Sequence, residues 1–341
     1  MKVKVAVVGA SGYAGAELVE ILGKHSNVSD MQLLVSENSE SKGLLFSDLY
    51  PRMQSICDVP LQAFTQTWLA ANADLDAVFF ATPHEYSQQW AHAFIELGIK
   101  VFDLSGAFRL SASSDYPKYY GFEHKHQNLI DEAVYGLAEW NAEQISTAQL
   151  VAVPGCYPTA SLLGLKPITS NGFNVKNGLT VVNGISGVSG AGRKASLATS
   201  FNELSLKAYN VLQHRHQPEI SQECGQQVIF NPHIAPFKRG LLSTVTMQIN
   251  PGVTAKDVAQ AFHSAYDNTP LVRIAKTWPQ IDDVSGSPFA SLFWQVDEEK
   301  QVVVVSCVID NLLKGAASQA IQCFNLANGF VITQGLLEGA K

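Results

Sequence analysis

The chain has 341 residues, of which 46% are hydrophobic and 16% charged, and its formal net charge is -7. That length predicts two domains, and the composition excludes disordered, collagenous and coiled-coil chains. The negative net charge argues against binding to nucleic acid or to an anionic membrane surface. No apolar run approaches the roughly 20 residues of a membrane helix. Small molecules are therefore the expected partners.

The start of the chain is typical of a first strand rather than a signal peptide, because only a short apolar stretch precedes the first glycines. This predicts a cytoplasmic protein. The 5 cysteines are odd in number and form no C-x-x-C pair, so we expect neither a disulfide framework nor a zinc or other metal site. They are Cys57, Cys156, Cys224, Cys307 and Cys323.

Strands alternate with helices over the first 155 residues. Strands are expected at 3–8, 31–35, 76–81, 100–104 and 150–153, and helices at 16–22 and 87–97. This alternation predicts right-handed βαβ units and a parallel sheet. The fold class is therefore α/β, with a Rossmann-type, nucleotide-binding domain over 1–155.

The pattern changes after residue 155. Longer strands separated by glycine-rich turns are expected at 179–182, 242–249 and 302–309, and helices at 257–266 and 313–326. Antiparallel strands covered by helices predict a second, α+β domain over 156–310. The alanine-rich segment 311–341 is expected to form a last helix that packs back on the first domain.

The first strand ends in glycines at the spacing G-x-x-G-x-x-G, formed by Gly9, Gly12 and Gly15. A backbone without side chains lets a pyrophosphate approach the N-terminus of the following helix, whose amides and dipole favour anions. The position after a strand and before an amphipathic helix predicts a dinucleotide site. The alternative is that these glycines only permit a tight turn.

The type of dinucleotide is left open by the residues after the second strand. Glu37, about 20 residues beyond the turn, could accept a hydrogen bond from a ribose hydroxyl as in NAD sites. Ser36, Ser39 and Lys42 could instead hold a 2′-phosphate.

Cys156 lies between the strand at 150–153 and a helical run expected to begin near Pro158. The dipole at a helix N-terminus lowers the pKa of a thiol and favours a thiolate nucleophile, and nearby amides could form an oxyanion hole. A buried, inert cysteine is the alternative.

Two histidines, His214 and His216, precede Pro218 and Glu219. Because Pro218 suits the first position of a helix, both histidines are expected on one face of an extended lead-in. Two imidazoles beside a carboxylate can supply a base and the group that orients it. Solvated histidines at the end of a loop are the alternative.

A series of segments runs in order along nearly the whole chain: the glycine turn, 103–109, 119–122, 135–139, 154–159, 186–194, 214–220 and 310–315. Together they resemble the N-acetyl-gamma-glutamyl-phosphate reductase family of arginine biosynthesis. The cysteine, histidine and glycine-arginine segments are specific to that family, whereas the glycine turn is shared with aspartate-semialdehyde dehydrogenases. Glu37 departs from the pattern, because an uncharged or basic contact with the adenosine phosphate is expected there.

The resemblance implies an NADP-dependent reductase that converts N-acetyl-gamma-glutamyl phosphate to N-acetylglutamate semialdehyde through a thioester on Cys156. It implies a catalytic domain of the semialdehyde dehydrogenase and glyceraldehyde-3-phosphate dehydrogenase type, and a homodimer or homotetramer. An aspartate-semialdehyde dehydrogenase-like reductase would share the mechanism but not the substrate. A regulator that binds a dinucleotide would keep the glycine turn without needing a reactive thiol.

The resemblance also implies roles for individual residues. The catalytic residues are Cys156, His214, His216 and Glu219. The cofactor contacts are Gly9, Ser11, Gly12, Tyr13, Ala14, Gly15, Ser36, Lys42, Thr82, Pro83, Ser186, Gly187 and Asn311. The substrate contacts are Ser105, Arg109, Arg193 and Lys194. For Arg109 the alternative is a surface salt bridge, and for Asn311 it is a helix N-cap, a role that Asp310 could equally fill.

Overall fold

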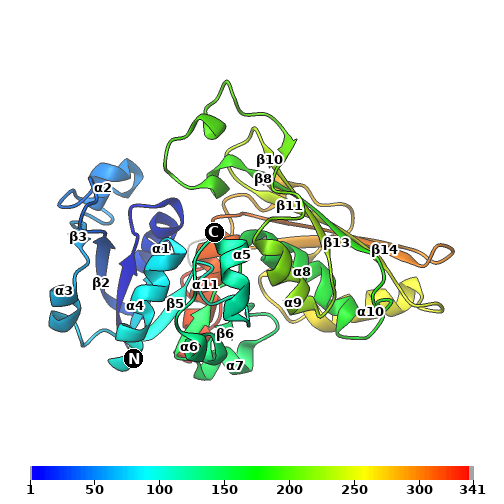
Figure 1. Ribbon diagram of the computed structural model, residues 1–341, viewed down its shortest axis with the longest axis horizontal. Helices are drawn as coiled ribbons and strands as arrows, with labels where there is room; N and C mark the ends of the chain where they lie inside the picture. Colours follow the sequence, from blue (N-terminus) through cyan, green and yellow to red (C-terminus); the bar gives the residue numbers. More distant parts are fainter. Residues whose placement is uncertain (1, 338–341) are drawn as a thin grey trace. The chain divides into compact units, whose positions relative to one another are not determined.

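The computed structural model describes residues 2–337, which form two compact units (Figure 1). The first unit runs to Pro154 and resumes at Ala316, and the second is Gly155–Gly315. Each unit contains one seven-stranded sheet. None of the helices in this part of the chain is both long enough and apolar enough to cross a membrane.

The sheet of the first unit is parallel throughout, which confirms the expected α/β architecture. Its strand order is β3-β2-β1-β4-β5-β7-β6. The strands are β1 (Val3–Val8), β2 (Val28–Val35), β3 (Gln62–Ala63), β4 (Ala77–Phe80), β5 (Lys100–Asp103), β6 (Val134–Tyr135) and β7 (Leu150–Ala152). β2 begins at Val28 rather than at residue 31, because its polar first residues still pair with β1 through the backbone.

Helices cover both faces of this sheet. They are α1 (Tyr13–Lys24), α2 (Phe46–Leu49), α3 (Gln66–Ala71), α4 (His84–Glu96), α5 (Tyr116–Tyr120), α6 (Gln127–Glu132), α7 (Ala142–Thr147) and α11 (Ser318–Ala327). On β1, Val5 and Val7 join a core with Phe324 of α11, whereas Val8 joins the opposite core with Phe94 of α4. Burial on both faces explains why a central strand such as β4, with the sequence AVFF, is a continuous apolar run.

The second unit contains a mixed sheet in the order β12-β13-β14-β11-β8-β10-β9. Its strands are β8 (Thr180–Gly187), β9 (Lys207–Ala208), β10 (Ile229–Ala235), β11 (Leu241–Gln248), β12 (Val272–Ile274), β13 (Ala290–Asp297) and β14 (Val302–Ile309). The antiparallel expectation is correct for β8, β11, β14 and β13, but β10 pairs parallel with β8 and β12 pairs parallel with β13.

Three helices belong to the second unit: α8 (Cys156–Thr169), α9 (His216–Cys224) and α10 (Ala255–Tyr266). α8 packs on β11 and β14, with Gly164 facing Val245 and Val305, and it contacts α9 and α10. Residues alternate between buried and half-buried along β11. One face of the sheet is therefore the core of the unit.

The helix expected at 313–326 is divided in two. Leu313–Ala317 forms a π-helical turn and α11 follows from Ser318. α11 packs against α1, α7 and β5 within the first unit.

Candidate active site

The glycine turn lies at the carboxyl end of β1, where the first sheet has β2 on one side and β4 on the other. Ligands of open parallel sheets bind at such a point of reversal in strand order. Gly9 has φ +88°, and a Cβ there would lie 2.2 Å from the carbonyl oxygen of Ala81. A Cβ on Gly15 would lie 2.3 Å from the carbonyl oxygen of Gly9. The fold itself therefore requires these two glycines.

Gly12 is different, because a Cβ there would meet only the carbonyl oxygen of Gly9, at the ordinary contact distance of 3.4 Å. Its φ of -81° is accessible to any residue. The tight turn therefore does not explain this glycine. Gly12 is the N-cap of α1, whose first-turn amides, including those of Tyr13 and Ala14, lie where a helix has no internal acceptors.

Tyr50 supports this turn, and the sequence analysis did not single it out. Its hydroxyl lies 2.9 Å from the carbonyl oxygen of Ser11 and 3.3 Å from that of Gly12, and donates to them. This contact fixes the backbone between the two glycines that the fold requires. No local pattern marks Tyr50, because it is 38 residues beyond Gly12.

The residues expected to choose between NAD and NADP lie together in the segment after β2. Ser36, Glu37 and Lys42 are exposed, and the Lys42 ammonium donates to the carbonyl oxygen of Glu37 at 3.1 Å. Burial, and to a smaller extent the charge of Glu37, raise the pKa of Tyr86 on α4 to about 12. The Lys42 ammonium and the Glu37 carboxylate thus lie in the same exposed loop, as the burial of their residues and the Lys42–Glu37 hydrogen bond show.

The loop after β4 contains the other cofactor candidates of the first unit. Thr82 Oγ1 is hydrogen-bonded to Ser87 Oγ at 2.8 Å, and Pro83 is the N-cap of α4. His84 Nδ1 accepts the amide of Gly106 at 2.7 Å. The loops that follow β4 and β5 are thereby tied to each other.

Arg109 is buried, so the alternative of a surface salt bridge is wrong. Its Nε donates to the carbonyl oxygen of Val153 at 2.8 Å and its Nη2 to that of Leu104 at 2.7 Å. The guanidinium joins the residues that directly follow β5 and β7. These carbonyls take two of its donors, because a carbonyl oxygen is a stronger acceptor in a buried site than in water.

Ser105 organises the turn after β5. Its hydroxyl donates to Asp103 Oδ2 at 2.8 Å and accepts the amide of Ala107 at 3.1 Å. Burial raises the pKa of Asp103, which is fully enclosed. The hydroxyl proton of Ser105 is thus directed at Asp103 in this structure.

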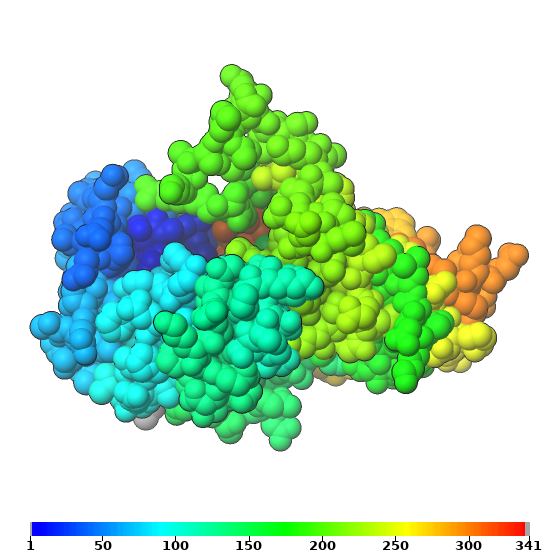
Figure 2. Space-filling model, in the orientation of Figure 1, coloured from blue at the N-terminus to red at the C-terminus, as the bar shows by residue number. Residues whose placement is uncertain are grey.

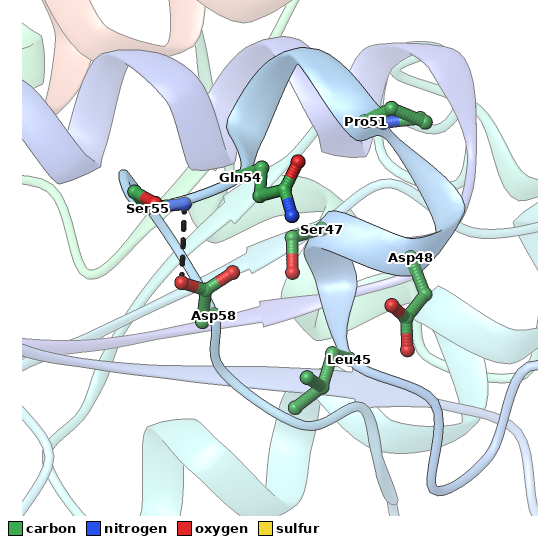
Figure 3. Close-up of a pocket in the computed structure, with 7 residues that line it drawn as sticks. All are labelled: Leu45, Ser47, Asp48, Pro51, Gln54, Ser55 and Asp58. Atoms are coloured by element: carbon green, nitrogen blue, oxygen red, sulfur yellow. Dashed lines mark hydrogen bonds between the residues drawn. The ribbon is translucent and has the colours of Figure 1, made fainter.

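A separate concavity of about 580 Å³ lies beside α2 and the 3₁₀ turn Pro51–Met53 (Figure 3). Its lining includes the carboxylates of Asp48 and Asp58, and Asp58 accepts the amide of Ser55 at 3.1 Å. None of the expected site residues lines it. Two carboxylates would repel the phosphates of a dinucleotide, so the concavity does not fit the cofactor.

Cys156 is the first residue of α8, with Gly155 as its N-cap, so the helix begins before the expected Pro158. Proline is tolerated at Pro158 because the first turn of a helix has no internal acceptor for the missing N–H. All five thiols are free, and Cys156 is the one that is partly accessible while the other four are buried. Burial raises the pKa of Cys224 to about 11, which leaves that thiol unreactive at neutral pH.

The backbone of the π-helical turn packs directly behind Cys156. A Cβ on Gly315 would lie 2.7 Å from Cys156 Cβ. This glycine therefore allows the close approach, and nothing in its local sequence indicates a partner so distant in the chain.

The histidines do not lie in an extended lead-in, because α9 begins at His216 and Pro218 occupies its third position. A proline in the first turn removes no internal hydrogen bond, so the helix starts before it. His214 and His216 are both buried, and their ring centroids are 4.7 Å apart. The alternative of solvated histidines is therefore wrong.

The ring of His214 accepts a hydrogen bond from the start of this helix, of which Arg215 is the N-cap residue. Its Nδ1 accepts the amide of His216 at 3.1 Å. Burial, assisted by the charge of Arg215, lowers the pKa of His214 to about 4. His214 is therefore neutral at pH 7, with Nδ1 unprotonated and the ring proton on Nε2.

Glu219 connects α9 to the start of α8. It is fully buried, and its Oε1 accepts the amide of Gly155 at 2.9 Å. The ring of Tyr157 contacts both histidine rings, with centroids 5.9 Å apart in each case. The second unit thus brings the cysteine segment together with the segment of the histidines and the carboxylate, although Gly155 and Glu219 are 64 residues apart in the sequence.

Asp310 rather than Asn311 caps the helical turn after β14, because Asp310 Oδ1 accepts the amides of Leu312 and Leu313 at 2.9 and 3.0 Å. The Asn311 side chain instead accepts the amide of Gly240 at 2.7 Å. The alternative of an N-cap at Asn311 is therefore wrong.

The remaining expected residues lie in and after β8. Ser186 is buried, and its hydroxyl donates to the carbonyl oxygen of Gly187 at 3.1 Å. A Cβ on Gly187 would lie 2.8 Å from the amide nitrogen of Arg239. Arg193 and Lys194 are exposed in the long segment between β8 and α9, which forms the light green projection of Figure 2.

Two family models match the chain, one in each of its two units. Residues 4–148 match the model described as "Semialdehyde dehydrogenase, NAD binding domain". Residues 156–311 match "Semialdehyde dehydrogenase, dimerisation domain".

The chain is similar along its whole length to curated proteins named N-acetyl-gamma-glutamyl-phosphate reductase. The protein of Pseudoalteromonas atlantica is 48% identical over 98% of this chain and 98% of its own length. That of Aliivibrio fischeri is 50% identical over 98% of this chain and 99% of its own, and that of Yersinia pestis is 50% identical over 97% and 98%.

Solved structures with the same fold include aspartate-semialdehyde dehydrogenases. Enzyme II of Vibrio cholerae superposes with a TM-score of 0.72 at 20% identity and covers 96% of this chain and 99% of its own. A probable enzyme of Pseudomonas aeruginosa gives 0.71 at 20% identity, covering 96% and 98%. At that identity the likeness concerns the fold alone.

Proposed function

Because this chain belongs to the N-acetyl-gamma-glutamyl-phosphate reductase family of the semialdehyde dehydrogenases, we propose that it reduces N-acetyl-gamma-glutamyl phosphate with NADPH. The products are N-acetylglutamate 5-semialdehyde and phosphate, in arginine biosynthesis. The observation that carries the proposal is the position of Cys156 at the N-terminus of α8, between Gly155, whose amide Glu219 accepts, and Tyr157, whose ring contacts both histidines. A regulator that only binds a dinucleotide would have no use for this arrangement.

Cys156 is the nucleophile in this proposal. Its Sγ attacks the acyl carbon, the carbon–oxygen bond to phosphate breaks with its electron pair, and a thioester remains. NADPH supplies the hydride that reduces the thioester when it is bound. The resulting thiohemiacetal collapses as the C–S bond breaks, which frees the thiolate and the aldehyde. A thiolate suits both steps, because it is a good nucleophile at neutral pH and a competent leaving group.

His216 is the base that takes the thiol proton, and His214 positions it. His214 is a poor base at neutral pH because its pKa is about 4, and its Nδ1 already accepts the amide of His216. Glu219 lies three residues after His216 on α9, which places the two side chains on the same face. Its carboxylate would stabilise the imidazolium that forms when His216 takes the proton.

The turn around Gly12 fits the pyrophosphate of NADP, because it offers open backbone at a helix N-terminus without an acidic residue in the first turn. Ser36 and Lys42 would hold the 2′-phosphate. We also assign Thr82, Pro83, Ser186, Gly187 and Asn311 to the cofactor, as the resemblance implies. The assignments of Ser105, Arg109, Arg193 and Lys194 to the substrate are retained as predictions.

We further propose that the second unit forms a homodimer through the face of its sheet opposite α8. The residues of that face are half-buried in the single chain and include Val181, Ile185, Leu242 and Val304. The match to a family described as a dimerisation domain supports this. Light scattering on the protein eluted from a size-exclusion column tests the dimer, and a monomeric mass would contradict it.

We also propose that the protein is cytoplasmic, which the five free thiols support. Cell fractionation tests this localisation.

The function is tested by the reverse reaction of the purified protein with NADP, phosphate and one semialdehyde at a time. We expect NADPH formation with N-acetylglutamate semialdehyde and little with aspartate semialdehyde. Preference for aspartate semialdehyde would favour the aspartate enzyme. NADP binding without turnover of either would favour a regulator.

A further inference from the structure

A π-helical turn packs against the residue that carries the proposed nucleophile. Gly315 belongs to this turn, and a Cβ built on it would lie 2.7 Å from Cys156 Cβ and 3.1 Å from Cys156 Cα. The Gly315 amide donates to the carbonyl oxygen of Asp310 at 3.0 Å, the five-residue step that defines a π-helix. Turns of this kind are rare and are found frequently at functional sites. Gly315 and Cys156 both lie in the second unit.

Asp310 holds this turn in place, and the mechanism above does not use it. The residue is fully buried, and its Oδ1 accepts the amides of residues 312 and 313. Its Oδ2 accepts the amide of Gly286 at 2.7 Å and forms an ion pair with Arg239. One carboxylate thus joins the start of the turn to two other segments of the second unit. The backbone that leads to Gly315 is therefore fixed independently of Cys156.

We propose that Gly315 is a positioning residue, whose backbone without a side chain sets the place of Cys156 at the start of α8 for attack on the acyl carbon. This inference rests on the proposed function and extends it to a residue that acts only through the cysteine. The chemistry is unchanged, because the C–S bond forms and the bond to phosphate breaks as described above. Gly315 contributes the distance and the direction from which Sγ approaches the substrate.

The overlap with an added methyl group shows how closely this packing controls the cysteine. Two carbon atoms in contact lie about 3.5–4.0 Å apart, so alanine at 315 and Cys156 must separate by roughly 1 Å. One of the atoms in the way is the Cα of Cys156, which cannot rotate aside as the end of a long side chain does. Since Asp310 holds the turn, the displacement falls mainly on the first residue of α8. A misplacement of about 1 Å at a reacting group can cost about a hundredfold in rate.

The alternative is that Gly315 serves the packing of the unit and nothing else. In that case alanine would lower the stability of the fold, but folded molecules would keep the reactivity of the wild-type thiol. Stability and thiol reactivity therefore have to be measured separately.

The test compares Gly315→Ala with Gly178→Ala in the full-length protein, at a temperature where both are folded. Gly178 is a matched control in the same unit, because a Cβ there would lie 2.8 Å from Val175 Cβ and 3.0 Å from the Val175 carbonyl oxygen. It precedes β8, in a segment that contains no candidate site residue. For each variant we measure the melting temperature, kcat and KM with N-acetylglutamate semialdehyde, and the pH dependence of Cys156 alkylation by iodoacetamide.

We expect Gly315→Ala to lower kcat about a hundredfold, with KM changed less than about threefold. The midpoint of its alkylation profile should move up by about half a pH unit, because the sulfur is displaced from the amides and the dipole at the helix N-terminus. Gly178→Ala should lower the melting temperature by a similar amount and leave kcat and the profile unchanged. A kcat within about threefold of wild type in Gly315→Ala, an unshifted profile, or an equal loss of kcat in Gly178→Ala would overturn the inference.

Asp310→Asn keeps the glycine and decides the question should Gly315→Ala fail to fold. Asparagine retains one carbonyl oxygen for the amides of residues 312 and 313, but it loses the ion pair with Arg239 and the acceptor for the amide of Gly286. We expect kcat to fall about tenfold and the alkylation profile to shift in the same direction, and a wild-type kcat or profile would overturn the inference. If the wild-type enzyme turns over no semialdehyde, the proposed function fails, whereas alkylation needs no substrate and still tests the position of the thiol.

Discussion

Alanine in place of Gly12 or of Gly15 distinguishes a glycine needed for cofactor binding from a glycine needed for folding. A Cβ on Gly12 meets nothing closer than 3.4 Å, so the folded chain accepts it. Alanine is a poorer N-cap than glycine by roughly 0.5–1 kcal/mol, and it reduces the entropy of the unfolded chain by roughly 0.4–1 kcal/mol. These effects nearly cancel. We expect a melting temperature close to that of the wild type.

Gly15→Ala has the opposite outcome. Its Cβ would lie 2.3 Å from the carbonyl oxygen of Gly9 and 2.9 Å from the Cα of Ala10, and neither is the flexible end of a side chain. Overpacking of this kind costs up to about 3 kcal/mol, of which the better helix propensity of alanine offsets about 1 kcal/mol. A net loss of about 2 kcal/mol lowers the melting temperature by roughly 4–8 °C for a unit of this size.

The assay is a fluorescence titration with NADPH at a temperature where both variants are folded. A methyl group on Gly12 occupies the space that a pyrophosphate oxygen would approach. We expect binding to weaken about 10- to 100-fold, which corresponds to about 1.4–2.8 kcal/mol. Wild-type affinity in Gly12→Ala would refute the reasoning, and the glycines would then serve only to form a turn.

The remaining site residues give four further predictions. Cys156→Ser should lower turnover more than a thousandfold, whereas Cys307→Ser should retain it. Peptide mapping after iodoacetamide treatment should show that labelling of Cys156 accompanies the loss of activity. Near-normal turnover in Cys156→Ser would exclude covalent catalysis through this residue. The folded state keeps His214 neutral to about pH 4, whereas the unfolded chain takes up a proton near pH 6.5, so this residue should cost on the order of 3 kcal/mol of stability between pH 6.5 and 4. Denaturant unfolding at several pH values should show that His214→Asn reduces this loss of stability, and an unaltered pH dependence would contradict the inference that burial lowers the pKa of His214. His216→Asn should lower kcat about 100- to 10,000-fold, because it removes the proposed base. NADPH should be the better cofactor and Lys42→Ala should weaken NADPH more than NADH, whereas a preference for NADH in steady-state kinetics would assign Glu37 to a ribose hydroxyl.

Local pattern was sufficient for the most apolar strands. The strands β1, β4 and β14 are largely apolar in the sequence, and their expected bounds agree with the structure to within a residue. Short edge strands such as β3, β6 and β9 were missed, because two residues paired through the backbone produce no periodicity. The longer strands β10 and β13 were missed as well, and with them the parallel pairing of β10 with β8, since strand direction depends on the crossover and not on the strand itself.

In the candidate site too, features set by neighbouring residues were predicted from the sequence, whereas features set by contacts in the folded chain were not. The glycine turn and Cys156 were visible because a strand-to-helix junction is a local event, in which the helix dipole and the absent side chains act within a few residues. The start of α9 was misplaced, because proline is acceptable at both the first and the third position of a helix, so Pro218 alone does not fix where the helix begins.

The sequence by itself therefore determined the alternation of strands and helices in the first unit, the two-part organisation and the family. Only the tertiary structure decided what each polar side chain touches. It showed that Arg109 binds backbone carbonyls, that Asp310 is the cap, and that Glu219 reaches the amide of Gly155. The physical reason is that a buried polar group must find a partner wherever the packed chain provides one, and that partner is commonly tens of residues away.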